Sequence, residues 1–415
     1  MKVEEFANVV GGGTPKTSIE EYWNGNIPWL TPKDLSGTHD RFISKGERFI
    51  SKEGLENSSA KLLPENSVLL SSRAPVGYVA IAKNPIATNQ GFRSLIPFDD
   101  YNSEFIYYLL LNNTAYLENH ASGTTFRELS GSVLSKLEFN IPPLATQKRI
   151  ADILGTLDDK IELNRQMNHT LEAMARAIFK SWFVDFDPVY AKLEGRDTPL
   201  PAEVLDLFPA ELVESELGLI PKGWEVGKVS DYGEVITGKT PSTKNPDYYS
   251  GEDVPFLKIP DMHDQFFITE TSNYLSLAGA NSQENKYIPA RSICVSCIAT
   301  PGLVVMPALQ VQTNQQINSV VPKSNLFSNF LLLALKRRGD EIRLRGSGGS
   351  VLRNLNKSDF SNITVIRPDN LQLKHFNNLI SPLFDKIINN QYQNHIISKT
   401  RDILLSKLMS GEVEV

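Results

Sequence analysis

The 415-residue sequence is poor in several features that would decide its class. It has only two cysteines, which excludes the disulfide framework of small secreted domains. No uninterrupted apolar run approaches the roughly 18 residues that a membrane-spanning helix needs. The opening MKVEE has no apolar signal-peptide stretch, so we expect a cytoplasmic protein. The net charge is −6, whereas free-standing DNA binders are usually basic, so any nucleic-acid contact must be local or shared with a partner.

The motifs of common active sites are also missing. There is no Gly-x-Ser-x-Gly elbow, no His-Glu-x-x-His helix, no Asn-Pro-Pro-aromatic motif of adenine-N6 methyltransferases and no glycine-rich cofactor fingerprint. The stretch GEVITGKT (Gly233–Thr240) fits a phosphate loop, but Pro241 and residues typical of turns follow where a helix is required. A glycine turn is favoured, and a phosphate-loop ATPase stays a minor alternative.

The two cysteines, Cys294 and Cys297, have the spacing of metal ligands. Structural zinc needs four ligands, and the sequence has no second cysteine pair and no paired histidines to complete the set. A half-buried strand is the favoured interpretation. We therefore expect this chain to hold no metal, to bind no cofactor of its own and to contain no catalytic residue.

What the sequence does contain is an internal repeat. ATNQGFRSLIP (Ala87–Pro97) returns as QTNQQINSVVP (Gln312–Pro322), and TPKTSIEEYWNGNIPWLTPKDL from Thr14 returns as TPSTKNPDYYSGEDVPFLKIPDM from Thr240. The spacing between matching residues stays at 225 to 227 throughout. Such a period is far above that of solenoid repeats, so each copy is a domain-sized unit.

Each copy predicts a strand-rich domain. Short β-like runs such as Ser67–Leu70 and Tyr78–Ala82 alternate with Gly, Pro and Asn. One helix is predicted over residues 103–119, with its counterpart near 327–344. The fold class is therefore mixed α/β (α+β), with two strand-rich domains in a pseudo-two-fold repeat.

Two long helices are predicted to separate these domains, and their apolar seams indicate that they pair as a coiled coil, antiparallel if a two-fold relates the copies. Residues 144–185 contain no proline and one glycine, Gly155, and their apolar residues recur at spacings of four and three. The same pattern returns after Pro368. A helix of about 40 residues is roughly 60 Å long and is unstable alone in water, so the two seams are predicted to pair. The seam residues are Ile150, Leu154, Leu157, Ile161, Asn164, Asn168, Leu171, Ile178, Ile380, Leu383, Ile387, Asn390, Asn394, Ile397, Leu404 and Leu408.

Two details of these helices carry separate predictions. Antiparallel pairing brings Asn164 to Asn394 and Asn168 to Asn390, and buried Asn pairs fix register at a cost in stability. The alternative is that these amides face solvent where the coil frays. Gly155 aligns with Ser381, just before a proline, which predicts that both helices start or kink there.

The chain therefore divides into five predicted segments. These are a first domain (1–143), a central helix (144–185), a proline-punctuated acidic connector (186–218), a second domain (219–368) and a C-terminal helix (369–415).

Polar residues in the loops are the candidate ligand contacts. Asn and Gln side chains suit adenine edges, and Arg and Lys suit guanine or phosphate. Residues shared by the copies are favoured as structural, above all Asn89 and Gln90, and base contacts are expected where the copies differ. The candidates are Thr14, Lys16, Asn89, Gln90, Arg127, Thr240, Ser242, Asn314, Gln315 and Arg353 in shared loops, Lys33, Arg41, Arg73 and Lys258 at differing positions, and Arg337 and Arg338 in a basic stretch.

The whole arrangement resembles the specificity subunit of type I restriction–modification systems. The resemblance covers essentially the whole chain and is carried by PPLATQKRIADILGTLDDKIELNRQ (142–166), SWFVDFDPV (181–189), GLIPKGWE (218–225) and LLSKLMSGE (404–412).

The resemblance implies a DNA-binding protein without catalysis of its own. Each strand-rich domain is then a target recognition domain that reads one half of an asymmetric, bipartite double-stranded DNA target. Two methyltransferase subunits would bring S-adenosylmethionine, and restriction/translocase subunits would use ATP and Mg. The alternative is a two-module protein-binding scaffold without DNA readout.

Overall fold

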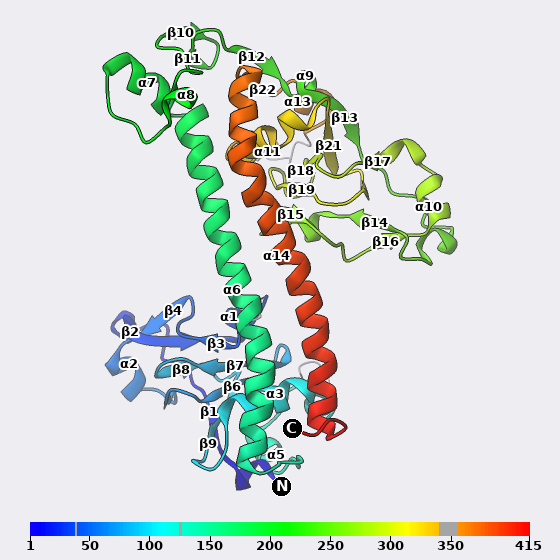
Figure 1. Cartoon of the computed structure of the whole chain (residues 1–415). Helices are drawn as coiled ribbons and strands as arrows, with labels where there is room; N and C mark the ends of the chain where they lie inside the picture. The colour runs from blue at the N-terminus through cyan, green and yellow to red at the C-terminus, as the bar shows by residue number, and fades with distance from the viewer. Residues whose placement is uncertain (38–39, 124–126, 340–354) are drawn as a thin grey trace. The chain divides into compact units, whose positions relative to one another are not determined.

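The computed structural model describes residues 1–37, 40–123, 127–339 and 355–415. The chain forms two compact units, which are described separately here (Figure 1). Unit 1 comprises Met1–Leu163 with Asn394–Val415, and unit 2 comprises Asn164–Gln393. Each unit contains one strand-rich domain and a part of each long helix. This division differs in kind from the five segments predicted from the sequence, which stay a prediction.

Unit 1 is built on two β-sheets. All five residues of β6 are buried, as expected for a strand covered on both faces. The five-stranded sheet has the order β1 (Ala7–Gly11), β9 (Arg93–Pro97), β6 (Val68–Ser72), β7 (Val76–Ala82) and β3 (Phe42–Ile43). The four-stranded sheet has the order β4 (Arg48–Ile50), β2 (Trp23–Leu30), β8 (Ile86–Thr88) and β5 (Leu62–Leu63).

Unit 2 repeats both sheets strand for strand. Its five-stranded sheet has the order β13 (Gly233–Thr237), β21 (Ile317–Pro322), β18 (Ile293–Ser296), β19 (Val304–Pro307) and β15 (Phe267–Ile268). Its four-stranded sheet has the order β16 (Tyr274–Leu275), β14 (Val254–Leu257), β20 (Val311–Thr313) and β17 (Tyr287–Ile288). Directions match as well, since β2 runs parallel to β8 as β14 does to β20. The repeated phrases in the sequence therefore encode one fold twice.

Smaller elements complete the units. In unit 1 these are α1 (Pro32–Leu35), α2 (Lys52–Glu56), α3 (Ser103–Asn112), α4 (Thr114–Asn119) and α5 (Gly131–Leu134). In unit 2 they are α7 (Asp187–Glu194), α8 (Ala202–Leu205), the hairpin β10 (Leu212–Ser215) and β11 (Gly218–Pro221), the pair β12 (Glu225–Lys228) and β22 (Thr364–Arg367), α9 (Val229–Tyr232), α10 (Leu277–Asn281), α11 (Ser328–Arg337) and α13 (Lys357–Ser361).

The helix predicted over residues 103–119 is two helices. Asn113 ends α3, and its amide Nδ2 donates to the carbonyl of Leu109 at 2.8 Å. Asn side chains compete in this way for backbone groups, which favours a helix end over a helix interior. The counterpart α11 ends at Arg337, and residues 340–344 of its predicted range lie outside the described residues.

Both long helices continue where the sequence predicts a break. Helix α6 (Leu144–Phe183) passes through Gly155, and α14 (Asn370–Ser410) contains Pro382. The prediction that both start there is wrong. Residues on the N-terminal side are buried, such as Ile150 and Phe376, and this packing offsets the local cost of about 1 kcal/mol for Gly and about 3 kcal/mol for Pro.

Within each unit the two long helices pair antiparallel. In unit 1, Ile150 and Leu154 share a hydrophobic core with Leu405 and Leu408. In unit 2, the rings of Phe179 and Phe376 lie 6.2 Å apart, between a C-terminal turn of α6 and an early turn of α14. Every residue of the predicted seam is buried or half-buried. No helix among the described residues is long and apolar enough to cross a membrane.

The asparagines lie inside the helix pair. Asn390 Nδ2 donates to Asn168 Oδ1 at 2.8 Å, and Asn168 Nδ2 lies 3.5 Å from the carbonyl of Ile387. Asn164 is fully buried and its amide donates to Gln393 Oε1 at 3.4 Å. The amides therefore bond across the pair rather than facing solvent, as register control requires. The Asn164–Asn394 contact stays a prediction.

Replacing Asn168 and Asn390 together with leucine should stabilise unit 2. The Oδ1 atom of Asn390 is buried without a hydrogen-bond partner among the described residues, and two apolar side chains remove this cost. We expect a gain of about 1–2 kcal/mol in urea denaturation. Asn168→Leu alone is the control and should destabilise by about 1–3 kcal/mol, since it leaves the Asn390 amide unpaired. A single variant as stable as the double would contradict the pairing.

Candidate nucleic-acid interface

The polar residues shared by the two copies form the same loop contact in each unit. In unit 1, Thr14 Oγ1 donates to Gln90 Oε1. In unit 2, Thr240 Oγ1 donates to Gln315 Oε1 at 2.6 Å. Both glutamines are exposed, so each Thr–Gln pair presents an amide group at the surface. Lys16 and Ser242 are exposed beside these pairs.

A glycine makes this loop contact possible. A Cβ atom on Gly12 would lie 2.0 Å from the carbonyl oxygen of Asn89, and one on Gly238 would lie 2.1 Å from that of Asn314. Gly238 belongs to the GEVITGKT stretch, and no helix opens in residues 239–245 after it. The structure therefore gives this stretch a close-packed turn and lacks the helix that a phosphate loop requires.

The side chains of Asn89 and Asn314 form hydrogen bonds within their own turns. Asn89 Oδ1 accepts from the backbone N–H of Gly91 at 2.8 Å, and Asn314 Oδ1 accepts from that of Gln316 at 3.1 Å. These bonds favour the structural interpretation of Asn89 and Asn314, because such local turns occupy the acceptor that would read an adenine.

The copies differ beside the Thr–Gln pair. In unit 1, Arg93 Nη2 lies 2.8 Å from a Glu128 carboxylate oxygen, and Arg73 Nη1 lies 3.9 Å from the other. Arg93 also donates to the carbonyl of Gln90 at 3.2 Å. Arg127 is exposed and precedes Glu128 directly. The structure thus places Arg93 beside Gln90, and Glu128 links Arg93 to Arg73.

In unit 2 the place of Arg93 is taken by Asn318. Its Oδ1 accepts from Thr237 Oγ1 at 2.6 Å, and its amide donates to the carbonyl of Leu355 at 3.4 Å. Arg353, the counterpart of Arg127, lies outside the described residues. Sequence reasoning missed Arg93, although it is a differing position inside the repeated phrase, which is the signal that would have found it.

The remaining candidate residues are scattered. Lys33 is an exposed partner of Glu47 at 3.2 Å. Lys258 donates to Asn273 Oδ1 at 2.8 Å and lies over the Phe256 ring. Arg337 is exposed, whereas Arg338 is half-buried and donates to the carbonyl of Thr364.

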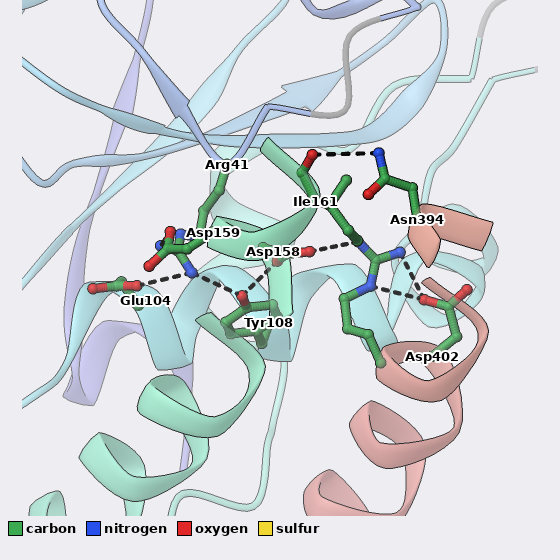
Figure 2. Close-up of polar contacts among 9 residues, drawn as sticks. Arg41, Glu104, Tyr108, Asp158, Asp159, Ile161, Asn394 and Asp402 are labelled. Atoms are coloured by element: carbon green, nitrogen blue, oxygen red, sulfur yellow. Dashed lines mark hydrogen bonds and ion pairs between the residues drawn. The ribbon is translucent and has the colours of Figure 1, made fainter. Parts of the chain in front are cut away.

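The prediction that Arg41 contacts bases needs correction. Its side chain is only 9% exposed and forms ion pairs with Asp159 at 2.6 Å and with Glu104 at 3.4 Å. Its Nη1 also donates to the hydroxyl of Tyr108 at 3.1 Å. Arg41 therefore attaches the first strand-rich domain to helix α6, as Figure 2 shows.

This network continues to helix α14 within unit 1. The Tyr108 hydroxyl donates to Asp158 Oδ2 at 2.5 Å, and Asp158 Oδ1 accepts from Arg401 at 2.7 Å (Figure 2). Burial raises the pKa of Tyr108 above its ordinary value, so the hydroxyl stays a neutral donor. Asn394 adds a bond to the carbonyl of Ile161 at 3.4 Å. Domain and both helices are thus joined by one polar network.

Gly155 makes room for Arg41. A Cβ at this position would lie 2.5 Å from Arg41 Nη1, so the glycine allows the close approach of this side chain. Its counterpart in unit 2 is Ser381, whose Oγ accepts from Asn329 at 3.0 Å.

The Gly155→Ala substitution should therefore not stabilise unit 1, although alanine in a helix interior normally raises the free energy of unfolding by about 1 kcal/mol relative to glycine. The new methyl group forces the Arg41 guanidinium from its partners, and we expect a net loss of about 1 kcal/mol in thermal unfolding. In an Arg41→Ala background the same change should stabilise by about 1 kcal/mol. Equal effects of Gly155→Ala in both backgrounds would contradict this account.

The two cysteines are buried in the core of unit 2. Burial raises the pKa of Cys294 to about 12 and that of Cys297 to about 11, so both stay neutral thiols. Among the described residues there is no cluster of three or more His, Cys, Asp or Glu side chains fit to hold a metal.

A family model for the type I restriction modification DNA specificity domain matches residues 1–173 and 221–399. This chain belongs to that family. It is 42% identical to the type I restriction enzyme HindI specificity subunit of Haemophilus influenzae, over 92% of this chain and 89% of that protein. It is 36% identical to the MjaIX specificity subunit of Methanocaldococcus jannaschii, over 100% of this chain and 93% of the relative.

A solved member of the family has the same fold. The crystal structure of the S subunit from M. genitalium matches with a TM-score of 0.60 at 15% identity, over 98% of this chain and 95% of that one. The duplicated strand-rich domain and the long helices are therefore features of the family.

Proposed function

We propose that this chain is the DNA-reading subunit of a type I restriction–modification enzyme and has no catalytic activity of its own. Each strand-rich domain reads one half of an asymmetric, bipartite double-stranded target. The observation that carries this proposal is one fold built twice with different side chains at an equivalent surface position, Lys16 and Ser242, both exposed beside the shared Thr–Gln pair. Two domains that read the same base sequence would need the same side chains at their DNA-facing positions.

The chemistry of these positions suits different bases. Unit 1 places Arg93 beside Gln90 and links it through Glu128 to Arg73, and guanidinium groups bond guanine in the major groove. In unit 2 the position of Arg93 is occupied by Asn318, which is buried and bonded to Thr237 and to the carbonyl of Leu355, so no guanidinium is available there. The Thr–Gln pairs are common to both and suit contacts that do not depend on sequence. We expect the two half-sites to differ.

The partners follow from the family. We propose that two methyltransferase (modification) subunits bind this chain and supply S-adenosylmethionine chemistry, and that restriction/translocase subunits add ATP- and Mg-dependent steps. A net charge of −6 fits a reader whose partners provide part of the phosphate contacts. Helices α6 and α14 act as the spacer that sets the distance between half-sites, which on one face of DNA lie about one helical turn apart.

Mapping of methylated adenines tests the proposal. A genome that carries this chain with its modification subunit should be methylated at one bipartite motif, and deletion of the chain should abolish it. Methylation that is independent of the chain would overturn the proposal. Salt-dependent binding of a bipartite duplex distinguishes it from a two-module protein scaffold, which would bind no DNA with or without the modification subunit.

A further inference from the structure

A cavity of about 530 Å³ lies in unit 2 between helix α6 and the second strand-rich domain. Its wall includes apolar side chains such as Phe179 and Leu333. Four cationic side chains also line it: Arg176 and Lys180 from α6, and Lys336 and Arg337 from α11. Cavities of this size and mixed lining are typical of small-ligand sites.

The lining carries more positive than negative charge. Among the described residues, the carboxylates that line it are Glu172, which lies 3.6 Å from Arg176, and Asp264. Within the described residues, no carboxylate lies at ion-pair distance from Lys336 or Arg337. Such a surplus is unusual in a chain whose net charge is −6.

Lys336 is held rigidly at this site. Its ammonium donates to the carbonyls of Gln265 at 3.0 Å and Val304 at 2.7 Å, and it lies over the Phe266 ring with Arg176 near the same ring. Burial, and then the nearby Arg176, lower the pKa of Lys336 to about 8. A bound anion would offset both effects, because it supplies the missing opposite charge.

The fold itself does not require these cations. In the equivalent positions of unit 1, Asn112 stands for Arg337, Leu111 for Lys336, Asp402 for Arg176 and Ser406 for Lys180. The same helices and sheets form there without any of the four positive charges. The cluster is therefore specific to unit 2 and not a general feature of the repeated fold.

We propose that this cavity binds a phosphate group, with Arg176 and Arg337 as its charged contacts and Lys336 as a fixed cation beside them. Guanidinium groups match phosphate oxygens bidentately, and arginine is the residue favoured for such contacts. The phosphate comes either from the DNA backbone, a source that rests on the proposed function, or from a free nucleotide. A DNA contact here would exist in one half of the target only.

The test uses the full chain with its modification subunit and the double variant Arg176→Gln/Arg337→Gln. The matched control is Arg196→Gln/Lys222→Gln, which removes two cations of the same unit that are ion-paired to Glu194 and Glu211 outside the cavity. Duplex binding is measured from 50 to 200 mM salt on the target and on a scrambled sequence. Adenosine monophosphate and inorganic phosphate are titrated by calorimetry in parallel.

If the phosphate belongs to DNA, the slope of log affinity against log salt falls by about 0.9 in the cavity variant, equally for both duplexes, and is unchanged in the control. If it belongs to a nucleotide, the wild-type chain binds adenosine monophosphate and the cavity variant loses this binding at least tenfold. A cavity variant that matches the control in both assays overturns the proposal. A wild-type complex that binds no duplex overturns the proposed function instead, and the nucleotide titration still tests the cavity.

Discussion

Exchange of residues 1–143 for the same segment of another specificity subunit changes one half of the methylated target and leaves the other half unaltered. This result is expected because the first strand-rich domain has its own two sheets, with hydrophobic clusters formed entirely by its own residues. Sequencing that detects methylated adenine measures the outcome directly. A change in both halves would refute modular readout.

The polar network between the first domain and α6 determines which donor segments can replace residues 1–143 without loss of contacts. The segment carries Arg41, Glu104 and Tyr108, whereas their partners Asp158 and Asp159 stay behind on α6. A donor that keeps an arginine and a tyrosine at the matching positions preserves these bonds. A donor with Arg41 replaced by alanine is the control, and it should give the same new half-site with a lower yield of assembled complex, because the Arg41–Asp159 bond between the segment and α6 is lost.

Phe376→Ala should destabilise unit 2 by about 3–5 kcal/mol. Phe376 is fully buried where α6 and α14 meet, and its ring centroid lies 4.9 Å from that of Phe183 and 5.9 Å from that of Trp182. Removing the ring leaves a cavity among aromatic side chains that cannot collapse easily. Hydrogen exchange followed by mass spectrometry should show faster exchange in residues 164–393.

Leu379→Ala provides the comparison on the same helix. Leu379 is 46% exposed, so its truncation should change stability by no more than about 0.5 kcal/mol. Equal loss of protection in the two variants would contradict the assignment of Phe376 to the core of the helix pair. Loss confined to residues 1–163 would contradict it as well.

Much of this fold can be predicted from the sequence, because the patterns that indicate its strands and helices lie within short stretches of residues. The run Tyr78–Ala82 lies within β7, and the repeated phrase Ala87–Pro97 covers β8 and β9 in one copy and their equivalents in the other. The heptad spacing after Pro143 predicts α6 within a few residues. Hydrophobic periodicity and repeated phrases can be detected by comparing short stretches of sequence, without knowledge of which distant residues meet.

The contacts that define the candidate site are not local. Arg41 meets Asp159 across 118 sequence positions, and nothing in the composition around Arg41 separates a buried ion pair from a base contact. The need for space at Gly155 cannot be read from the sequence for the same reason, since the side chain that occupies this space comes from another part of the chain. Arg93 is visible in the sequence only once the copies are compared position by position.

The two domains are fastened to the helices by different chemistry, although they share one fold. Where the first uses Arg41, Tyr108 and Asp158, the second has Phe266, Leu333 and Phe384, and the rings of Phe266 and Phe384 lie 5.5 Å apart. We therefore expect that exchange between related chains can replace the first strand-rich domain by the first strand-rich domain of another member of the family. A first domain moved to the position of the second would place the guanidinium of Arg41 against apolar side chains. Under the proposed function, the attachment of the domains to the helices, and not only their reading loops, then determines the order of the half-sites along DNA.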